Sequence, residues 1–123
     1  MDINKTILIG RLTKDADISY TPQGTAISNF SIAVDHMKKK EGAQDTSFFQ
    51  CKAFGKLAEG LKPYLLKGKQ VGISAFAKQE RWEKDGQKQS RVIFYCEEIE
   101  LLGGNQNNSN GGYNNNDDYG YGN

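Results

Sequence analysis

The sequence predicts an all-β domain with one short helix, followed by a disordered tail. Five segments have strand composition, and several of them alternate apolar and polar residues, as strands with one buried face do. One segment, residues 55–67, instead has apolar residues at helical spacing, and it lies between the third and fourth predicted strands. Five antiparallel strands with a helix at that point are the order of the OB-fold, a partly open five-stranded Greek-key barrel.

The first half of the chain predicts two of these strands. A strand is expected at residues 6–12, where Gly10 indicates a bulge or a tight bend. Residues 21–24, Thr-Pro-Gln-Gly, have the pattern of a type I turn and precede a long strand at residues 25–36. Alternate residues of that strand, from Phe30 to Val34, are apolar, so one of its faces is expected to be buried.

The helical segment is expected to be short and kinked. Pro63 has no N–H to donate to the carbonyl of Glu59, and Gly68 is a natural residue to follow a helix end. A helix that reaches Gly68 with a kink at Pro63 is therefore predicted.

The last two strands are expected at residues 70–82 and 89–102. The Asp85-Gly86 pair between them is a signal for a tight hairpin turn. Apolar residues on both sides of the final strand, from Val92 to Tyr95, predict burial of both of its faces.

Composition divides the chain into a domain at residues 1–102 and a tail at residues 103–123. The tail holds eight Asn, six Gly and three Tyr, with no Leu, Ile, Val or Phe, so it is predicted to be disordered. All 16 basic residues lie in the domain, and two of the 15 acidic residues, Asp117 and Asp118, lie in the tail, which leaves the domain with a net charge of +3. That charge permits a polyanionic partner without requiring one.

Several classes of protein are not supported. No stretch is long and apolar enough for a membrane span, and the N-terminal residues do not have the form of a signal peptide, so a cytoplasmic protein is expected. Cys51, Cys96 and the single His36 show no metal-ligand spacing, so no metal or cofactor is predicted and the two cysteines are expected to be small buried hydrophobes. Without clustered carboxylates, a phosphate-cradling loop or a nucleophile motif, an enzyme is not expected.

The strand expected at residues 46–54 carries aromatic rings on the face opposite to its apolar one. Phe48 and Phe54 share that face with Gln50 and Lys52. Rings set among cations are what a groove needs to stack bases and to hold phosphates. From this strand alone, packing of the two rings under a loop or a neighbouring subunit explains the pattern equally well.

Trp82, the only Trp, shifts the balance toward binding. Alternation along residues 70–82 places it opposite to the apolar set, near the hairpin tip and beside Arg81 and Lys84. Together with Phe48 and Phe54 it is predicted to line one groove. Every base has a π-face, and a duplex hides those faces, so single strands of any sequence are the predicted ligand.

Five short segments follow the order of one known family: residues 4–12 (NKTILIGRL), 20–24 (YTPQG), 54–59 (FGKLAE), 64–68 (YLLKG) and 81–82 (RW). Through them the chain resembles the bacterial single-stranded DNA-binding proteins of the SSB family over essentially all of residues 1–102. The resemblance implies an OB-fold that assembles, usually as a homotetramer, with single-stranded DNA wrapped around it. It also implies a role in DNA replication, recombination and repair, in the cytoplasm and at the nucleoid.

The resemblance implies base stacking at Phe48, Phe54 and Trp82, in agreement with the alternation of the strands. Phosphate contacts are expected from basic residues at the family's basic positions, in the first motif, or on the same strand faces as the rings. These are Lys5, Arg11, Lys52, Lys56, Lys67, Lys78 and Arg81.

The chain departs from the family in four places. Phe48 stands where relatives often have Trp, and it offers a smaller stacking surface. Residues 38–40, all Lys, replace a Trp that some relatives carry, so contact through charge is expected there instead of stacking. Glu80 falls where relatives are commonly basic, and it is left outside the predicted site. Residues 117–123 lack the acidic Pro-Phe tip through which relatives recruit replication and repair enzymes. Either the native C-terminus is missing from this sequence, or such partners are recruited differently.

Three other hypotheses stay open at this point. The same fold serves RNA-binding modules and replication-restart proteins, which stacking alone distinguishes poorly from a DNA-binding protein. The Asn/Gly/Tyr tail is also typical of segments that drive condensation. An enzyme is the least supported of the three.

Overall fold

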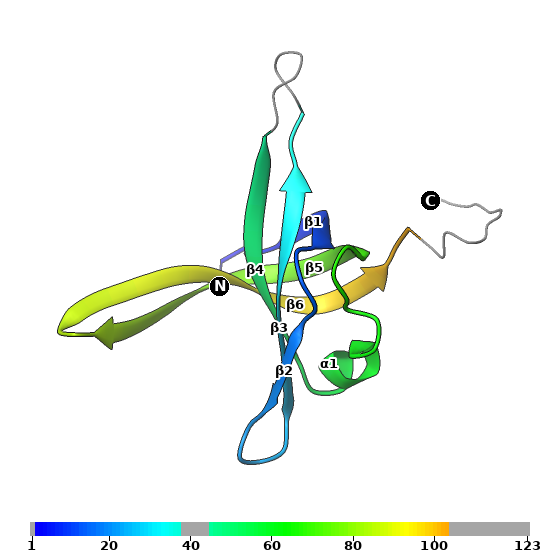
Figure 1. Ribbon diagram of the computed structural model, residues 1–123. Helices are drawn as coiled ribbons and strands as arrows, with labels where there is room; N and C mark the ends of the chain where they lie inside the picture. The colour runs from blue at the N-terminus through cyan, green and yellow to red at the C-terminus, as the bar shows by residue number, and fades with distance from the viewer. Residues whose placement is uncertain (1, 38–44, 104–123) are drawn as a thin grey trace.

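The strands of the computed structural model, which describes residues 2–37 and 45–103, form one sheet that closes into a barrel (Figure 1). The strand order is β1-β5-β6-β4-β3-β2, and a further pairing of β1 with β3 closes five of the six strands, so the predicted OB-fold is confirmed. β2 pairs with β3 alone, outside the closed ring. The elements are β1 (Thr6–Leu12), β2 (Asp17–Tyr20), β3 (Ala26–Asp35), β4 (Thr46–Phe54), α1 (Gly55–Leu61), β5 (Gln70–Lys84) and β6 (Gln87–Leu101).

One pairing in the ring is parallel, where a fully antiparallel arrangement was expected. β4 and β6 run in the same direction and pair through Cys51 with Phe94 and Lys52 with Tyr95. A closed ring with an odd number of strands cannot alternate direction all the way round, so one parallel neighbour is unavoidable. This pairing brings β4 beside the β5–β6 hairpin, although the two are far apart in the sequence.

The interior of the barrel is filled by alternate residues of its strands, as the sequence pattern predicts. Ala58 of α1 and Leu65 after it are also buried, so the helix packs against the core. Cys51 is fully buried and Cys96 half-buried, and both are free thiols. The buried cluster consists of Leu12, Ala26, Phe30, Ile32, Cys51, Ala53, Ala58, Leu65, Val71, Ile73, Ala75 and Ile99.

Gly10 is required by a close approach of two strands, and no bulge lies there. β1 keeps one uninterrupted register with β5, and the register shift of this sheet falls instead between Ser74 and Ala75, where β5 pairs with β6. A Cβ atom at Gly10 would lie 2.5 Å from the carbonyl oxygen of Ala33. The next residue, Arg11, already pairs with Ala33 of β3, so Gly10 lies where the barrel closes.

The helix is shorter than predicted. It ends at Leu61, because Pro63 cannot donate to the carbonyl of Glu59. That carbonyl accepts a hydrogen bond from the Lys62 N–H instead, at 3.3 Å. Gly68 lies in the turn that follows, with a φ of 86°, and not at the helix end.

The β5–β6 hairpin continues past the barrel as an arm, which points to the left in Figure 1. Its tip is the predicted tight turn, where Asp85 and Gly86 both have positive φ, at 51° and 77°. Val92 lies on this arm and is exposed, so burial of both faces of the last strand is wrong at that residue. The arm has no barrel interior beneath it.

Some predictions fall on parts of the chain that the structure does not describe. The lysines at residues 38–40 and the tail from residue 104 onward lie outside the described residues, so the expectations for them stay predictions. Within the described ranges, no helix has the length and apolar character needed to cross a membrane.

Candidate nucleic-acid interface

The aromatic faces predicted separately for β4 and β5 form one continuous surface. Paired residues on neighbouring strands point to the same face of a sheet, and Tyr95 of β6 pairs with Lys52 on one side and with Phe76 on the other. By alternation, the same face carries Phe48 and Phe54 of β4, and Glu80 and Trp82 of β5. We call this surface, with Arg91 of β6 opposite Glu80, the outer face.

Three rings stack in a row on the outer face. The ring centroids of Phe54 and Tyr95 are 5.5 Å apart with an interplanar angle of 29°, and those of Phe76 and Tyr95 are 5.4 Å apart with an angle of 30°. Tyr95 therefore lies between two rings from different strands. Phe54 is the member of this row that is predicted to stack bases, and one side of its ring is already stacked on Tyr95.

The three predicted stacking residues all lie outside the barrel core. Their exposed fractions are 66% for Phe48, 39% for Phe54 and 42% for Trp82. Trp82 lies on the arm, where the guanidinium of Arg91 sits over its ring at 5.2 Å from the centroid. Trp82 and Arg91 also line an open groove of about 740 Å³ on the arm, together with Lys78, Gln79, Glu80 and Arg81.

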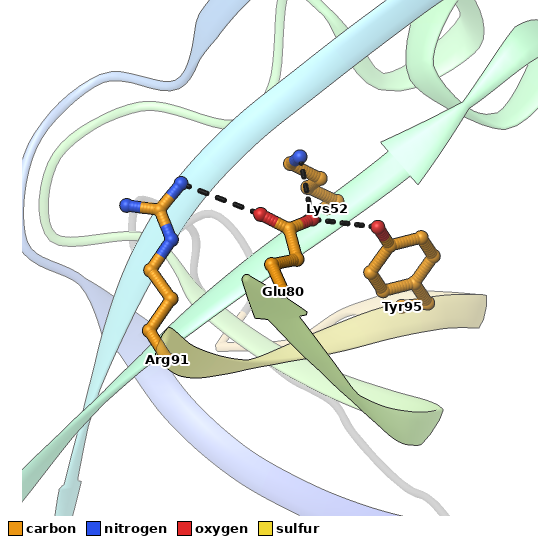
Figure 2. A network of polar contacts seen from close by, with 4 residues as sticks. All are labelled: Lys52, Glu80, Arg91 and Tyr95. Carbon is orange, nitrogen blue, oxygen red and sulfur yellow. Dashed lines mark hydrogen bonds and ion pairs between the residues drawn. The ribbon is translucent and has the colours of Figure 1, made fainter. Parts of the chain in front are cut away.

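Glu80, which was left outside the predicted site, lies on the outer face and contacts Lys52, Tyr95 and Arg91 (Figure 2). Its Oε2 accepts hydrogen bonds from Lys52 Nζ at 2.8 Å and from Tyr95 Oη at 2.6 Å, and its Oε1 lies 3.5 Å from Arg91 Nη2. The side chains of Lys52 and Glu80 are only 20% and 19% exposed. The hydrogen bond from Lys52, followed by that from Tyr95, lowers the pKa of Glu80 to about 2, so the carboxylate is ionised at neutral pH.

The structure brings some of the predicted basic residues to the rings and leaves others elsewhere. Lys52 and Lys78 lie on the outer face, and Lys56 follows Phe54 by two residues at the start of α1. Lys5 lies beside β5, where Asn4 exchanges two hydrogen bonds with the backbone of Ala77. Lys5 is itself paired with Glu97 at 2.9 Å, which raises the pKa of Lys5.

Arg11, Lys67 and Arg81 are not gathered at the row of rings. Arg11 donates to the carbonyl of Gly68 at 3.2 Å, so it lies near Lys67, the residue before Gly68. On β5 it pairs with Gln70, at the opposite end of the barrel part of that strand from Phe76. Arg81 alternates to the opposite face of the arm from Trp82 and donates to Gln79 at 2.6 Å.

Sequence analysis missed Phe76, Tyr95 and Arg91, although a signal for them was present. A two-residue turn at Asp85-Gly86 fixes the register of the hairpin from the turn as far as Ala75, where the register shifts. Counting back from that turn pairs Glu80 with Arg91 and Phe76 with Tyr95, as the structure shows.

Comparison with known proteins agrees with this architecture. The closed five-stranded barrel, with α1 between β4 and β5, is an OB-fold, and a model of the "Single-strand binding protein family" matches residues 3–102. The chain belongs to that family. It is 38% identical over 104 residues to the single-stranded DNA-binding protein of Treponema pallidum, covering 83% of this chain and 59% of that protein. It is 43% identical over 102 residues to single-stranded DNA-binding protein 2 of Clostridium acetobutylicum, covering 81% of this chain and 77% of that protein.

Two solved structures have the same fold. One is a deletion mutant of the single-stranded DNA-binding protein from Thermus aquaticus, with a TM-score of 0.71 and 32% identity, which covers 83% of this chain and 51% of that one. The other is the Plasmodium falciparum SSB in complex with single-stranded DNA, with a TM-score of 0.74 and 21% identity, which covers 83% of this chain and 96% of that one. At 21% identity the second comparison shows the fold alone.

Proposed function

We propose that this protein binds single-stranded DNA without sequence preference and protects it during replication, recombination and repair, with no catalytic activity of its own. The observation that carries the proposal is the outer face, where aromatic rings lie outside the barrel core among basic side chains. Family membership supports the same function and a site of action in the cytoplasm, at the nucleoid.

Bases are proposed to stack on Phe48, Phe54 and Trp82, and each stacked base is worth about 1–3 kcal/mol. The Tyr95 ring stacks on the Phe54 ring and is itself stacked on Phe76, which helps to hold Phe54 in place. The backbone phosphates are proposed to contact basic side chains on the outer face and, farther along the DNA, basic side chains that lie away from the row of rings. The proposed contacts are Lys5, Arg11, Lys52, Lys56, Lys67, Lys78 and Arg81.

We expect oligo-dT to quench the fluorescence of Trp82 strongly, because a base that stacks on the ring changes its surroundings directly. Trp82 is the only Trp, so the whole signal comes from this position. Titrations at several salt concentrations are expected to give a slope of log K against log salt of about −0.7 for each phosphate neutralised.

Duplex DNA and a matched RNA strand serve as controls for this titration. Duplex DNA is expected to give little response, since its bases are already stacked. A response to the duplex as strong as that to oligo-dT would contradict the proposal, and tighter binding of the RNA strand would favour an RNA-binding module.

We also propose that the chain assembles with copies of itself, as a homotetramer, through the outward side of β1. Ile7 and Ile9 point away from the barrel and are strongly exposed, which is typical of a surface that another chain covers. A double variant, Ile7→Lys with Ile9→Lys, is expected to lower the mass measured by light scattering toward that of a single 13.7 kDa chain. Leu66→Lys, at another exposed apolar residue, is the control, and an unchanged mass in the double variant would rule out this surface.

A further inference from the structure

We propose that Glu80 withholds Lys52 and Arg91 from DNA phosphates, and that this carboxylate thereby limits both the affinity of the outer face for single-stranded DNA and its response to salt. The inference rests on the proposed function, because it concerns the same surface. It goes further because it gives the Glu80 carboxylate a defined role in that surface, at a place where a nucleic-acid site would favour a cation.

The geometry of the ion pairs carries the inference. Glu80 comes from β5 and reaches Lys52 of β4 across the intervening strand β6, while Arg91 of β6 lies directly opposite Glu80 in the sheet. The side chains of Lys52 and Arg91 both reach Glu80 (Figure 2). Along the strands, Lys52 lies two residues before Phe54, and Glu80 lies two residues before Trp82. Two cations of the outer face, Lys52 and Arg91, are therefore already paired with an anion, whereas Lys78 has no ion pair among the described residues.

A carboxylate and a phosphate present the same kind of acceptor oxygen to these donors. Lys52 Nζ lies 2.8 Å from Glu80 Oε2, which is the distance of a charge-assisted hydrogen bond. The ionised state of Glu80 is secured by these bonds, so protonation does not release the cations at neutral pH. A DNA phosphate has to replace the carboxylate or bind beside it without the help of Lys52 and Arg91.

Glu80 also affects the ring on the arm through Arg91. The guanidinium of Arg91 contacts Glu80 Oε1 at 3.5 Å and at the same time covers one face of Trp82. While this contact holds, a base can stack on the other face of Trp82 only. Release of Arg91 from Glu80 makes the guanidinium available to a phosphate next to the stacked base.

Glu80→Gln is the direct test, with binding measured by the fluorescence anisotropy of a labelled oligo-dT. At low salt the variant is expected to bind about threefold to tenfold more tightly than the wild type, and the salt slope is expected to steepen by about 0.7 for each freed cation. Glu83→Gln is the matched control, because it removes the same charge from the same arm and Glu83 has no ion pair among the described residues. It is expected to change the slope far less.

Lys52→Gln added to Glu80→Gln assigns the gain to a cation. The double variant is expected to lose a large part of the added affinity, because Lys52 is one of the two groups that the first substitution frees. The same experiment is made with Arg91→Gln added to Glu80→Gln. If the gain in affinity persists in full in both double variants, Glu80 acts through its charge alone, and the inference is overturned.

Two further outcomes would also overturn it. One is a Glu80→Gln variant that binds no more tightly than Glu83→Gln, and the other is weaker binding with an unchanged melting temperature. If Glu80→Gln is unfolded at the assay temperature, Glu80→Asp is measured instead. This variant keeps the charge but draws the carboxylate back from both cations. A salt slope equal to that of the wild type would then refute the inference. A wild-type protein that does not bind oligo-dT would instead refute the proposed function.

Discussion

A protein that carries both Phe54→Ala and Trp82→Ala is expected to lose most of its affinity for oligo-dT and to remain folded. Each base that stacks on a ring is worth about 1–3 kcal/mol, so the two substitutions together are expected to cost about 2–6 kcal/mol, or about 30-fold at the least. Titration of labelled oligo-dT, followed by anisotropy, measures the loss. The salt slope is expected to change little, because neither ring contacts a phosphate.

The two single variants are expected to differ. Phe54→Ala uncovers Tyr95, which lies 5.5 Å from the Phe54 ring and can offer a base part of the lost surface. Among the described residues no other ring stacks on Trp82, and the guanidinium of Arg91 lies over its ring. Trp82→Ala is therefore expected to be the more costly of the two.

Thermal unfolding supplies the control for both variants. Trp82 lies on the arm and Phe54 outside the buried cluster, so the melting temperature is expected to change by a few degrees at most. Val92→Ala, on the same arm but on its other face, is expected to leave the affinity unchanged. Unfolding of both ring variants would show that the rings are part of the core, and an unchanged affinity would assign them to subunit packing.

Much of the fold could be predicted because alternation and turn signals are local properties of the sequence. Apolar residues at every second position of β3 identified its buried face, and Asp85-Gly86 identified the hairpin. The same alternation placed Phe48, Phe54 and Trp82 outside the core, as the structure shows.

The centre of the site could not be predicted in the same way. Lys52 meets Glu80 only because β4 and β6 pair in parallel, and no local pattern specifies a pairing between two strands that a helix and the long strand β5 separate in the sequence. Tyr95 was missed for a different reason. Its neighbours Ile93 and Phe94 indicate burial on both faces, and Ile93 is indeed buried, whereas Tyr95 is only half-buried and its hydroxyl donates to Glu80 on the outer face.

Gly10 shows how a correct signal can have a different cause from the expected one. A glycine inside a strand indicates a bulge, a bend or the close approach of another backbone, and the sequence alone does not distinguish these. The third cause applies here, because the nearest atom to a Cβ at Gly10 would be the Ala33 carbonyl oxygen. That distinction changes the expected effect of a substitution.

Gly10→Ala is expected to destabilise the domain strongly. The added methyl group would lie 2.5 Å from the carbonyl oxygen of Ala33 and 3.0 Å from Val34 Cγ2, and a backbone atom cannot yield as the end of a flexible side chain can. Overpacking of this kind typically costs 1–3 kcal/mol or more, and a domain of this size loses about 4–8 °C of melting temperature per kcal/mol. We expect the melting temperature to fall by about 10 °C or more.

Gly60→Ala is the matched control, because it adds the same methyl group where no atom lies within 4 Å of the new Cβ. Inside a helix this change typically stabilises a protein by about 0.5–1 kcal/mol, and Gly60 lies in the last turn of α1, so the melting temperature is expected to stay the same or to rise slightly. Both variants are measured at one protein concentration, since assembly of the chain makes the melting temperature depend on concentration. If Gly10→Ala has the melting temperature of the wild type, β1 and β3 can move apart at Ala33 without a loss in the free energy of unfolding. The closure of the barrel would then not depend on this contact.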